Sequence, residues 1–258
     1  TRERMKPVDE EILPEALRFM SDAKADDTPF FVWFNTTHMH FRTHVKDGSR
    51  GQAGRWQSEY HDVMIDHDEL VGEILAFLDE QGLADDTIVV YSTDNGPHIN
   101  SWPDAGMTPF RNEKNSNWEG AYRVPAVVRW PGHMAAGEGL NGIVSHNDRF
   151  VTLLSSAGDP DIKEELHGGR EIDGTTYKVH LDGHNQLDYL TGATDQSPRQ
   201  HFFYVSDDGD LTALRFDNWK IVFLEQRATG TLQVWAEPYT ELRVPKIFAF
   251  QLRRMLRA

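Results

Sequence analysis

Apolar residues at helical spacing mark three helices in the chain. Residues 9–25 and 57–81 place aliphatic side chains three or four positions apart, and Gly82 stands where the second helix should stop. A shorter helix is predicted over residues 150–157, with Asn147 or Asp148 as its N-cap.

Three continuous apolar runs predict buried strands. They cover residues 29–34, 87–92 and 125–130. Runs that are apolar on both faces are typical of a parallel or mixed sheet that helices cover. Over residues 1–160 we therefore predict an α/β domain that holds part of a mixed sheet sandwiched by helices.

The pattern changes near residue 160. Residues 159–200 are polar and rich in turn formers, and short β-prone runs follow over residues 202–224. Asp-Asp-Gly-Asp at 207–210 and Asp-Asn at 217–218 separate these runs and predict tight turns. Residues 161–258 are therefore predicted to form a smaller antiparallel α+β subdomain.

Composition limits the partners. The 258 residues contain 26 Lys and Arg against 41 Asp and Glu, a formal charge of −15, which disfavours nucleic acid and anionic membranes and suits a protein that holds cations. The absence of cysteine excludes disulfides, thiolate metal sites and a cysteine nucleophile. No apolar run reaches the ~20 residues of a membrane span, so the sequence predicts a soluble protein.

Candidate metal ligands follow the strand predicted over residues 87–92. In an open α/β sheet, ligands bind beyond the carboxyl ends of strands. Asp94 and Asn95 stand there with oxygen atoms suited to a hard cation, and Gly96 would let the backbone turn away. Asp-Asn-Gly is also a common turn sequence, which leaves a purely structural alternative open.

Basic side chains are the candidates for binding an anion. His38 and His40 follow the run at 29–34, with His44 beyond them, and Lys114 lies in a long loop after residue 96. An ammonium beside a bound cation would suit an oxyanion substrate. Each of these side chains could instead be a solvated loop residue.

Taken together, these segments resemble the sulfatase family. The resemblance rests on the apolar run and His-Met-His of residues 30–40 and on Tyr-Ser-Thr-Asp-Asn-Gly of residues 91–96. It also rests on Lys114 followed by Glu-Gly-Ala-Tyr-Arg-Val-Pro at 119–125, and on residues 145–158. Residues 159–248 are similar to the C-terminal subdomain of bacterial arylsulfatases.

The resemblance implies a role for each matching residue. Asp94 and Asn95 would be two ligands of a divalent cation, usually Ca²⁺ in this family. Lys114 would bridge the sulfate oxygens, and His40 would contact the sulfate and assist departure of the alcohol, with His38 also in the substrate site. Glu119 and Arg123 would hold the loop that carries Lys114.

The chain also departs from the family. Sulfatases use a formylglycine made from Cys or Ser in a Cys/Ser-x-Pro-x-Arg motif, and this chain has no cysteine, while Ser-Trp-Pro at 101–103 lacks the Arg. The family's early Asp-Asp ligands are missing, and Asp-Asp at 26–27 precedes a predicted strand, so it is no substitute. Residues 249–258 differ from the usual tail. The chain is therefore expected to be a truncated sulfatase, the C-terminal half without the formylglycine motif.

Four functions remain open. The first is a sulfuric-ester hydrolase with little turnover, acting on a small-molecule sulfate ester. The others are a non-catalytic binding protein, a phosphate-ester hydrolase, and a protein that binds Zn²⁺ or Cu²⁺ on histidines 38, 40, 44 and 98. Open sheet edges predict a homo-oligomer or association with a missing N-terminal half. The compartment, bacterial periplasm or cytoplasm, is left open.

Overall fold

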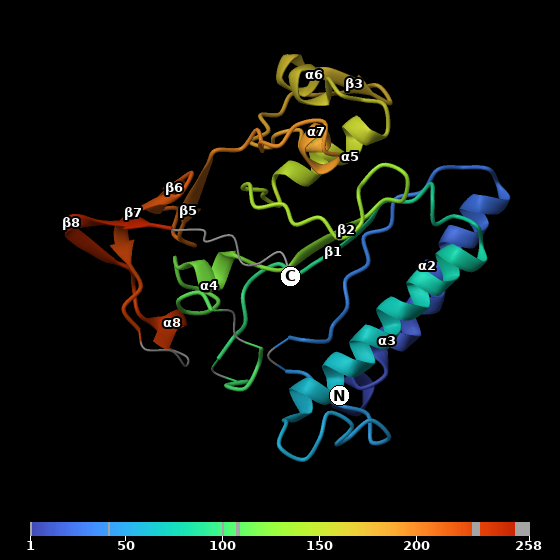
Figure 1. The fold of residues 1–258 in the computed structure, drawn as a ribbon, viewed down its shortest axis with the longest axis horizontal. Coiled ribbons are helices and arrows are strands. Elements are labelled where there is room, and N and C mark those ends of the chain that lie inside the picture. Colours follow the sequence, from blue (N-terminus) through green and yellow to red (C-terminus); the bar gives the residue numbers. More distant parts are fainter. Residues whose placement is uncertain (1, 41, 100, 107–108, 229–232, 251–258) are drawn as a thin grey trace. The chain divides into compact units, whose positions relative to one another are not determined.

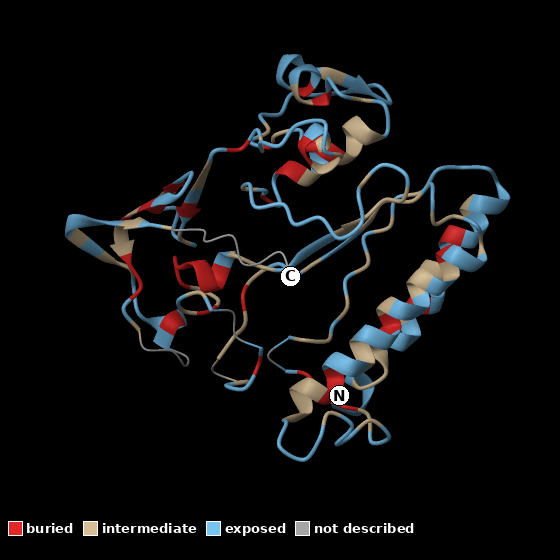
Figure 2. Ribbon diagram, viewed as in Figure 1, coloured by how far each residue is buried: buried red, intermediate tan, exposed pale blue. Residues whose placement is uncertain are grey.

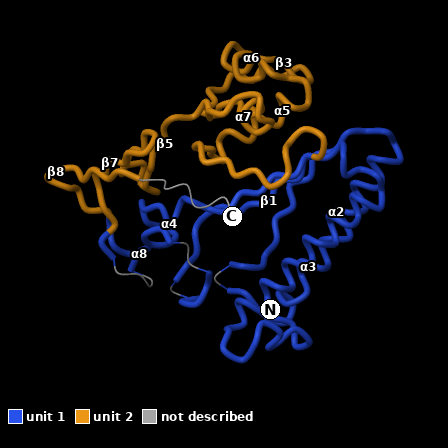
Figure 3. The backbone as a smooth tube through the Cα atoms, viewed as in Figure 1, with its two compact units in different colours: residues 1–130, 227–238 blue, residues 131–226, 239–258 orange. Residues whose placement is uncertain are grey.

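The computed structural model describes all residues except 1, 41, 100, 107–108, 229–232 and 251–258. The chain forms two compact units, coloured separately in Figure 3: residues 1–130 with 227–238, and residues 131–226 with 239–258. The predicted boundary near residue 160 stays a prediction, because compactness does not show which segments fold alone. The unusual C-terminal tail lies outside the described residues from 251 onward.

The first unit is built around two long helices that lie side by side (Figure 1). They confirm the helices predicted from apolar spacing, and buried positions recur along the pair (Figure 2). Ser58 caps α3 by accepting from the Tyr60 amide at 3.3 Å, and Gly82 ends it with a φ of +65°. The elements of this unit are α1 Arg2–Met5, α2 Val8–Ala25, α3 Glu59–Glu80, β1 Val89–Ser92, α4 Glu119–Tyr122, β2 Ala126–Arg129 and α8 Gln233–Ala236.

The strands of the first unit form where predicted but are less buried than predicted. β1 and β2 pair antiparallel, Val89 opposite Arg129, which agrees with a mixed sheet, but they are not buried on both faces, since Val127 is 60% exposed. Residues 29–34 are extended without a strand partner among the described residues, and Phe31 and Trp33 are 69% and 77% exposed. An apolar run indicates that burying these side chains would be favourable, but it does not identify the segment that buries them.

The second unit contains a four-stranded antiparallel sheet in the order β5-β6-β7-β8. β5, β6 and β7 confirm the predicted runs, and the turn between β6 and β7 places Asp217 at a φ of +47°. Residues 159–200, predicted as turn-rich, contain two short helices and a hairpin, and β8 was not predicted. The elements are α5 Asp148–Ser156, α6 Ile162–Gly168, β3 Arg170–Ile172, β4 Thr175–Tyr177, α7 Leu187–Leu190, β5 His201–Val205, β6 Leu211–Phe216, β7 Trp219–Glu225 and β8 Thr240–Ala249.

A buried carboxylate organises the second unit. Asp148 begins α5, but neither it nor Asn147 caps the helix with its side chain as predicted. Instead the Asp148 carboxylate accepts from the Arg199 guanidinium at 2.6 Å, and also from the backbone amides of Ser145 and His184. Burial raises the pKa of Asp148, but the bond from Arg199 and the backbone bonds outweigh it and leave the pKa below its ordinary value.

Within the described residues, no helix is both long and apolar enough to cross a bilayer.

Candidate functional site

The turn that carries the two histidines is fixed by a carboxylate on α2. Asp9 is 2% exposed and accepts from the backbone amides of Thr37 and His38, at 2.7 and 2.9 Å. The His38 Nδ1 atom donates to the same carboxylate at 2.7 Å. Burial raises the pKa of Asp9, but these hydrogen bonds outweigh it and lower the pKa to about 2. Asp9 is therefore ionised at neutral pH and holds the turn in place.

His38 and His40 occupy different surroundings. The His38 ring is bound to Asp9, and its Nε2 atom is buried without a hydrogen-bond partner. Met39, between the two histidines, has a φ of +71°, and His40 is exposed. His38 thus faces α2 through one nitrogen, while His40 lies at the surface, where a ligand can reach it.

Backbone hydrogen bonds join the Asp-Asn-Gly loop to the Lys114 loop. The Gly96 amide donates to the Ala121 carbonyl at 2.7 Å, and the Lys114 amide donates to the Pro97 carbonyl at 3.0 Å. A Cβ on Gly96 would lie 1.7 Å from the Gly120 carbonyl oxygen. Gly96 is therefore required for close approach of two backbones. Its predicted role of letting the chain turn away stays a prediction, and Gly96 is not among the glycines with positive φ.

The loop that carries Lys114 is held from inside by Glu113. This residue is fully buried, and its Oε2 atom accepts from the Ile99 amide at 2.7 Å. The Ser116 hydroxyl donates to the Glu113 carbonyl at 2.7 Å. Left-handed conformations at Asn112 and Asn115, with φ near +69° and +67°, flank the tight bend. The bend therefore fixes the position of the Lys114 backbone, from which its side chain extends.

Glu119 and Arg123 lie where the resemblance implied a supporting role. Glu119 is 5% exposed, and its carbonyl accepts from the Arg123 amide at 2.8 Å across α4. The Arg123 guanidinium stacks 4.3 Å from the centroid of the Phe110 ring. Arg123 therefore contacts the loop on which Lys114 lies, and Glu119 is bound to Arg123.

Lys114 is half-buried and belongs to a cluster of basic groups. His98 lies within electrostatic range of Glu113, Lys114 and His40. Burial lowers the pKa of His98, Lys114 and His40 add to the lowering, and Glu113 opposes it. His40 and Lys114 thus each lie within electrostatic range of His98, although 73 residues separate the two in sequence.

Asp94 and Asn95 follow β1 as predicted, but they do not form a complete metal site. Asp94 is exposed and accepts from the Thr93 hydroxyl at 3.3 Å, while the Asn95 amide nitrogen donates to the Gly96 carbonyl at 2.9 Å. That bond leaves the Asn95 side-chain oxygen for a cation. Ca²⁺ takes about six to eight oxygen ligands, so these two residues fit its chemistry without filling its shell.

The zinc or copper centre on histidines stays a prediction. In the described part of the chain, no group of three or more His, Asp or Glu side chains could hold a metal ion. His44, a candidate for such a centre, is half-buried beside Thr43 and Val45, both of which are buried.

Three residues of this region were not identified from the sequence. Asp9 precedes the turn it holds by 28 residues, and no local pattern signals that contact. Glu113 looks like one more charged residue of a polar loop. Trp235 lies in α8 and donates its indole N–H to His98 Nε2 at 3.0 Å, across 137 residues of sequence. The sequence signal was a tryptophan between Val234 and Ala236, which matches no motif.

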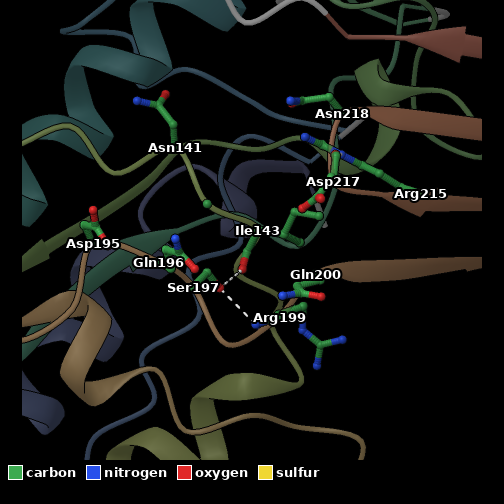
Figure 4. Close-up of a pocket in the computed structure, with 11 residues that line it drawn as sticks. Asn141, Ile143, Asp195, Gln196, Ser197, Arg199, Gln200, Arg215, Asp217 and Asn218 are labelled. Atoms are coloured by element: carbon green, nitrogen blue, oxygen red, sulfur yellow. Dashed lines mark hydrogen bonds between the residues drawn. The ribbon is translucent and has the colours of Figure 1, made fainter.

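The second unit contains a cavity of about 350 Å³ with mostly polar walls (Figure 4). Ser197 is one of the residues that line it, and its hydroxyl donates to the Ile143 carbonyl at 2.6 Å and accepts from the Arg199 amide at 3.1 Å. The Arg199 guanidinium is engaged by Asp148. None of the residues predicted for the substrate or metal site lines this cavity.

The sequence and the fold are similar to those of sulfatases. The chain is 30% identical to an arylsulfatase of Hemicentrotus pulcherrimus, over 83% of this chain and 35% of that protein, and 30% identical to human arylsulfatase A, over 80% and 38%. The crystal structure of the PsFucS1 sulfatase from Pseudoalteromonas sp. matches with a TM-score of 0.84 and 27% identity, over 96% of this chain and 47% of that one.

The chain thus spans between a third and two fifths of the length of these curated relatives. The family model described as "Sulfatase" matches residues 2–159, which is more than half of the chain. This match confirms the resemblance seen in the motifs, and the chain belongs to the sulfatase family.

Proposed function

We propose that this chain carries the oxyanion-binding part of a sulfuric-ester hydrolase site, with Lys114 as its central residue. The observation that supports this most is the hydrogen bond from the Lys114 amide to Pro97. It places the start of the lysine side chain beside the loop of Asp94 and Asn95, in the region that also contains His98 and His40. The substrate is a small-molecule sulfate ester.

Each residue has a role that follows from its chemistry. The Lys114 ammonium binds the sulfate oxygens, because it offers three donors and a positive charge. His40, exposed at the surface, donates a proton to the departing alcohol. Asp94 and Asn95 supply two oxygen ligands to a divalent cation, most simply Ca²⁺, which would neutralise sulfate charge.

Turnover by the chain alone should be low. The resemblance implies a formylglycine nucleophile, and the 258 residues contain neither a cysteine nor a Ser-x-Pro-x-Arg motif from which to make it. General acid help contributes typically ~10²–10⁴-fold and does not replace a covalent nucleophile. We therefore infer binding of the ester with hydrolysis near background, unless a partner chain completes the site.

Calcium calorimetry and an aryl sulfate assay test this proposal. Two protein ligands predict weak calcium binding, which Asp94→Ala should abolish and the control Asp27→Asn, on another exposed loop, should retain. Unchanged calcium binding in Asp94→Ala would overturn the metal assignment. Rapid aryl sulfate hydrolysis that survives both Lys114→Ala and His40→Ala would show that the chemistry lies elsewhere.

A further inference from the structure

Trp235 is held against the basic cluster by contacts that involve its ring and its neighbour. Its indole Nε1 donates to His98 Nε2 at 3.0 Å, and the two rings meet edge to face with centroids 6.0 Å apart. The adjacent Val234 is 1% exposed, and its carbonyl accepts from the Asn115 side chain at 2.8 Å. Two hydrogen bonds thus fix α8: one to His98 and one to Asn115, the residue after Lys114.

The ring of Trp235 is nevertheless 51% exposed. The Lys114 Nζ atom lies 5.8 Å from its centroid, so the open part of the indole lies beside the ammonium that would hold a sulfate group. Single exposed aromatic residues are ordinary on protein surfaces. Trp56 is such a case, because it is 82% exposed and its ring contact is with the neighbouring Arg55.

Two features distinguish Trp235 from an ordinary surface tryptophan. Its only polar side-chain atom is already satisfied by His98, so the exposed remainder of the ring is apolar. Its backbone is held next to a buried residue, so little conformational freedom is lost when a ligand packs on it. A rigid apolar face beside a cation suits a molecule with an anionic group on a ring.

We propose that Trp235 determines specificity by contacting the alcohol ring of the ester whose sulfate Lys114 binds. This inference rests on the proposed function. The preferred alcohol is a neutral ring with one apolar face, either an aryl group or a sugar. The formal charge of −15 disfavours a polysulfated chain, which the acidic protein would repel.

Calorimetric titration with four probes tests the proposal: inorganic sulfate, phenyl sulfate, a monosaccharide 6-sulfate and butyl sulfate. Trp235→Ala should weaken a ring ester by ~5-fold or more, because aromatic contacts add to simple area burial. Sulfate and the acyclic butyl sulfate should change less than about twofold. Trp235→Phe should retain part of the preference, and the control Trp56→Ala should retain all of it. The two ring esters distinguish an aryl group from a sugar.

Two results would overturn this inference while leaving the proposed function intact. In one, Trp235→Ala weakens sulfate and the ring esters equally, which would show a structural role. In the other, it weakens none of them. Failure of the proposed function looks different, because then inorganic sulfate either does not bind or binds equally well to Lys114→Ala. In that case the role of Trp235 is overturned with it.

Discussion

Replacing Asp9 with asparagine tests whether one carboxylate holds the turn that carries His38 and His40. In the folded chain, Asp9 is 2% exposed and accepts hydrogen bonds from two backbone amides, the Thr37 hydroxyl and the His38 ring. Asparagine has almost the same shape but no charge. It also offers one acceptor oxygen in place of two, so several of these donors lose their partner.

The magnitude follows from the pKa of Asp9. Hydrogen bonds overcome the opposing effect of burial and lower that pKa from 3.8 to about 2. A carboxyl group with this difference between unfolded and folded chain adds about 2 kcal/mol to the free energy of unfolding at neutral pH. Because the folded pKa is the lower one, the contribution is complete well above pH 4 and is lost as the pH falls toward 2.

Urea unfolding at pH 7 should therefore show Asp9→Asn to be less stable than the unsubstituted chain by about 2 kcal/mol. The matched control is Asp22→Asn on the same helix, where a 64% exposed side chain pairs with Arg18 at 3.2 Å. Such a surface pair contributes about 0–1 kcal/mol. Equal losses in the two variants, or a gap between Asp9→Asn and the unsubstituted chain that does not narrow below pH 4, would refute this reasoning.

Three further predictions concern packing, a buried ion pair and the exposed aromatic residues. Gly96→Ala should destabilise the chain by about 1–3 kcal/mol or more in urea, because its Cβ would meet a carbonyl at 1.7 Å, whereas Gly106→Ala, with open space around it, should be near neutral. Arg199→Met should cost about 3–5 kcal/mol by leaving the buried Asp148 carboxylate without its cationic partner, and a loss below about 1 kcal/mol would contradict this. Light scattering at micromolar concentration should show self-association that Trp33→Lys reduces, because Trp33 is 77% exposed, and a monodisperse monomer would count against it.

Local periodicity identified the elements whose burial follows from their own sequence. The stripe of residues 57–81, with Gly82 as its stop, predicted α3 within two residues at each end, because one helix face packs on α2. The Asp-rich turns separated β5, β6 and β7 correctly, since each turn needs a residue with positive φ, Gly209 in one case and Asp217 in the other. These features depend on neighbours in the chain.

Features that depend on distant partners were not predictable in the same way. The run at 29–34 has strand composition but no strand partner among the described residues, and composition carries no information about partners. α6 and the β3–β4 hairpin lie in a polar segment, where the apolar pattern is weak. Ile162 and Leu166 of α6 pack with Val151 of α5 in one buried cluster, and these residues come together only in the folded chain.

The candidate site shows the same division. Lys114, His40, Asp94 and Asn95 could be named because they match motifs of a family, and their roles stay proposals. Asp9 and Trp235 could not be named, because their contacts are with residues far away in the sequence. The close approach at Gly96 was also hidden, since a glycine in Asp-Asn-Gly predicts a turn before it predicts backbone contact.

The measurement that tests the central claim most directly is protection of the chain by inorganic sulfate against thermal unfolding. If Lys114 binds the oxyanion, sulfate should raise the melting temperature by an amount that grows with its concentration, in the manner of any ligand that binds only the folded state. Lys114→Ala should remove most of that rise, while Lys178→Ala, an exposed lysine of the second unit, should keep it. Sodium chloride at matched ionic strength serves as the reference, because salt alone changes surface electrostatics. An equal rise in Lys114→Ala and the unsubstituted chain would contradict the account.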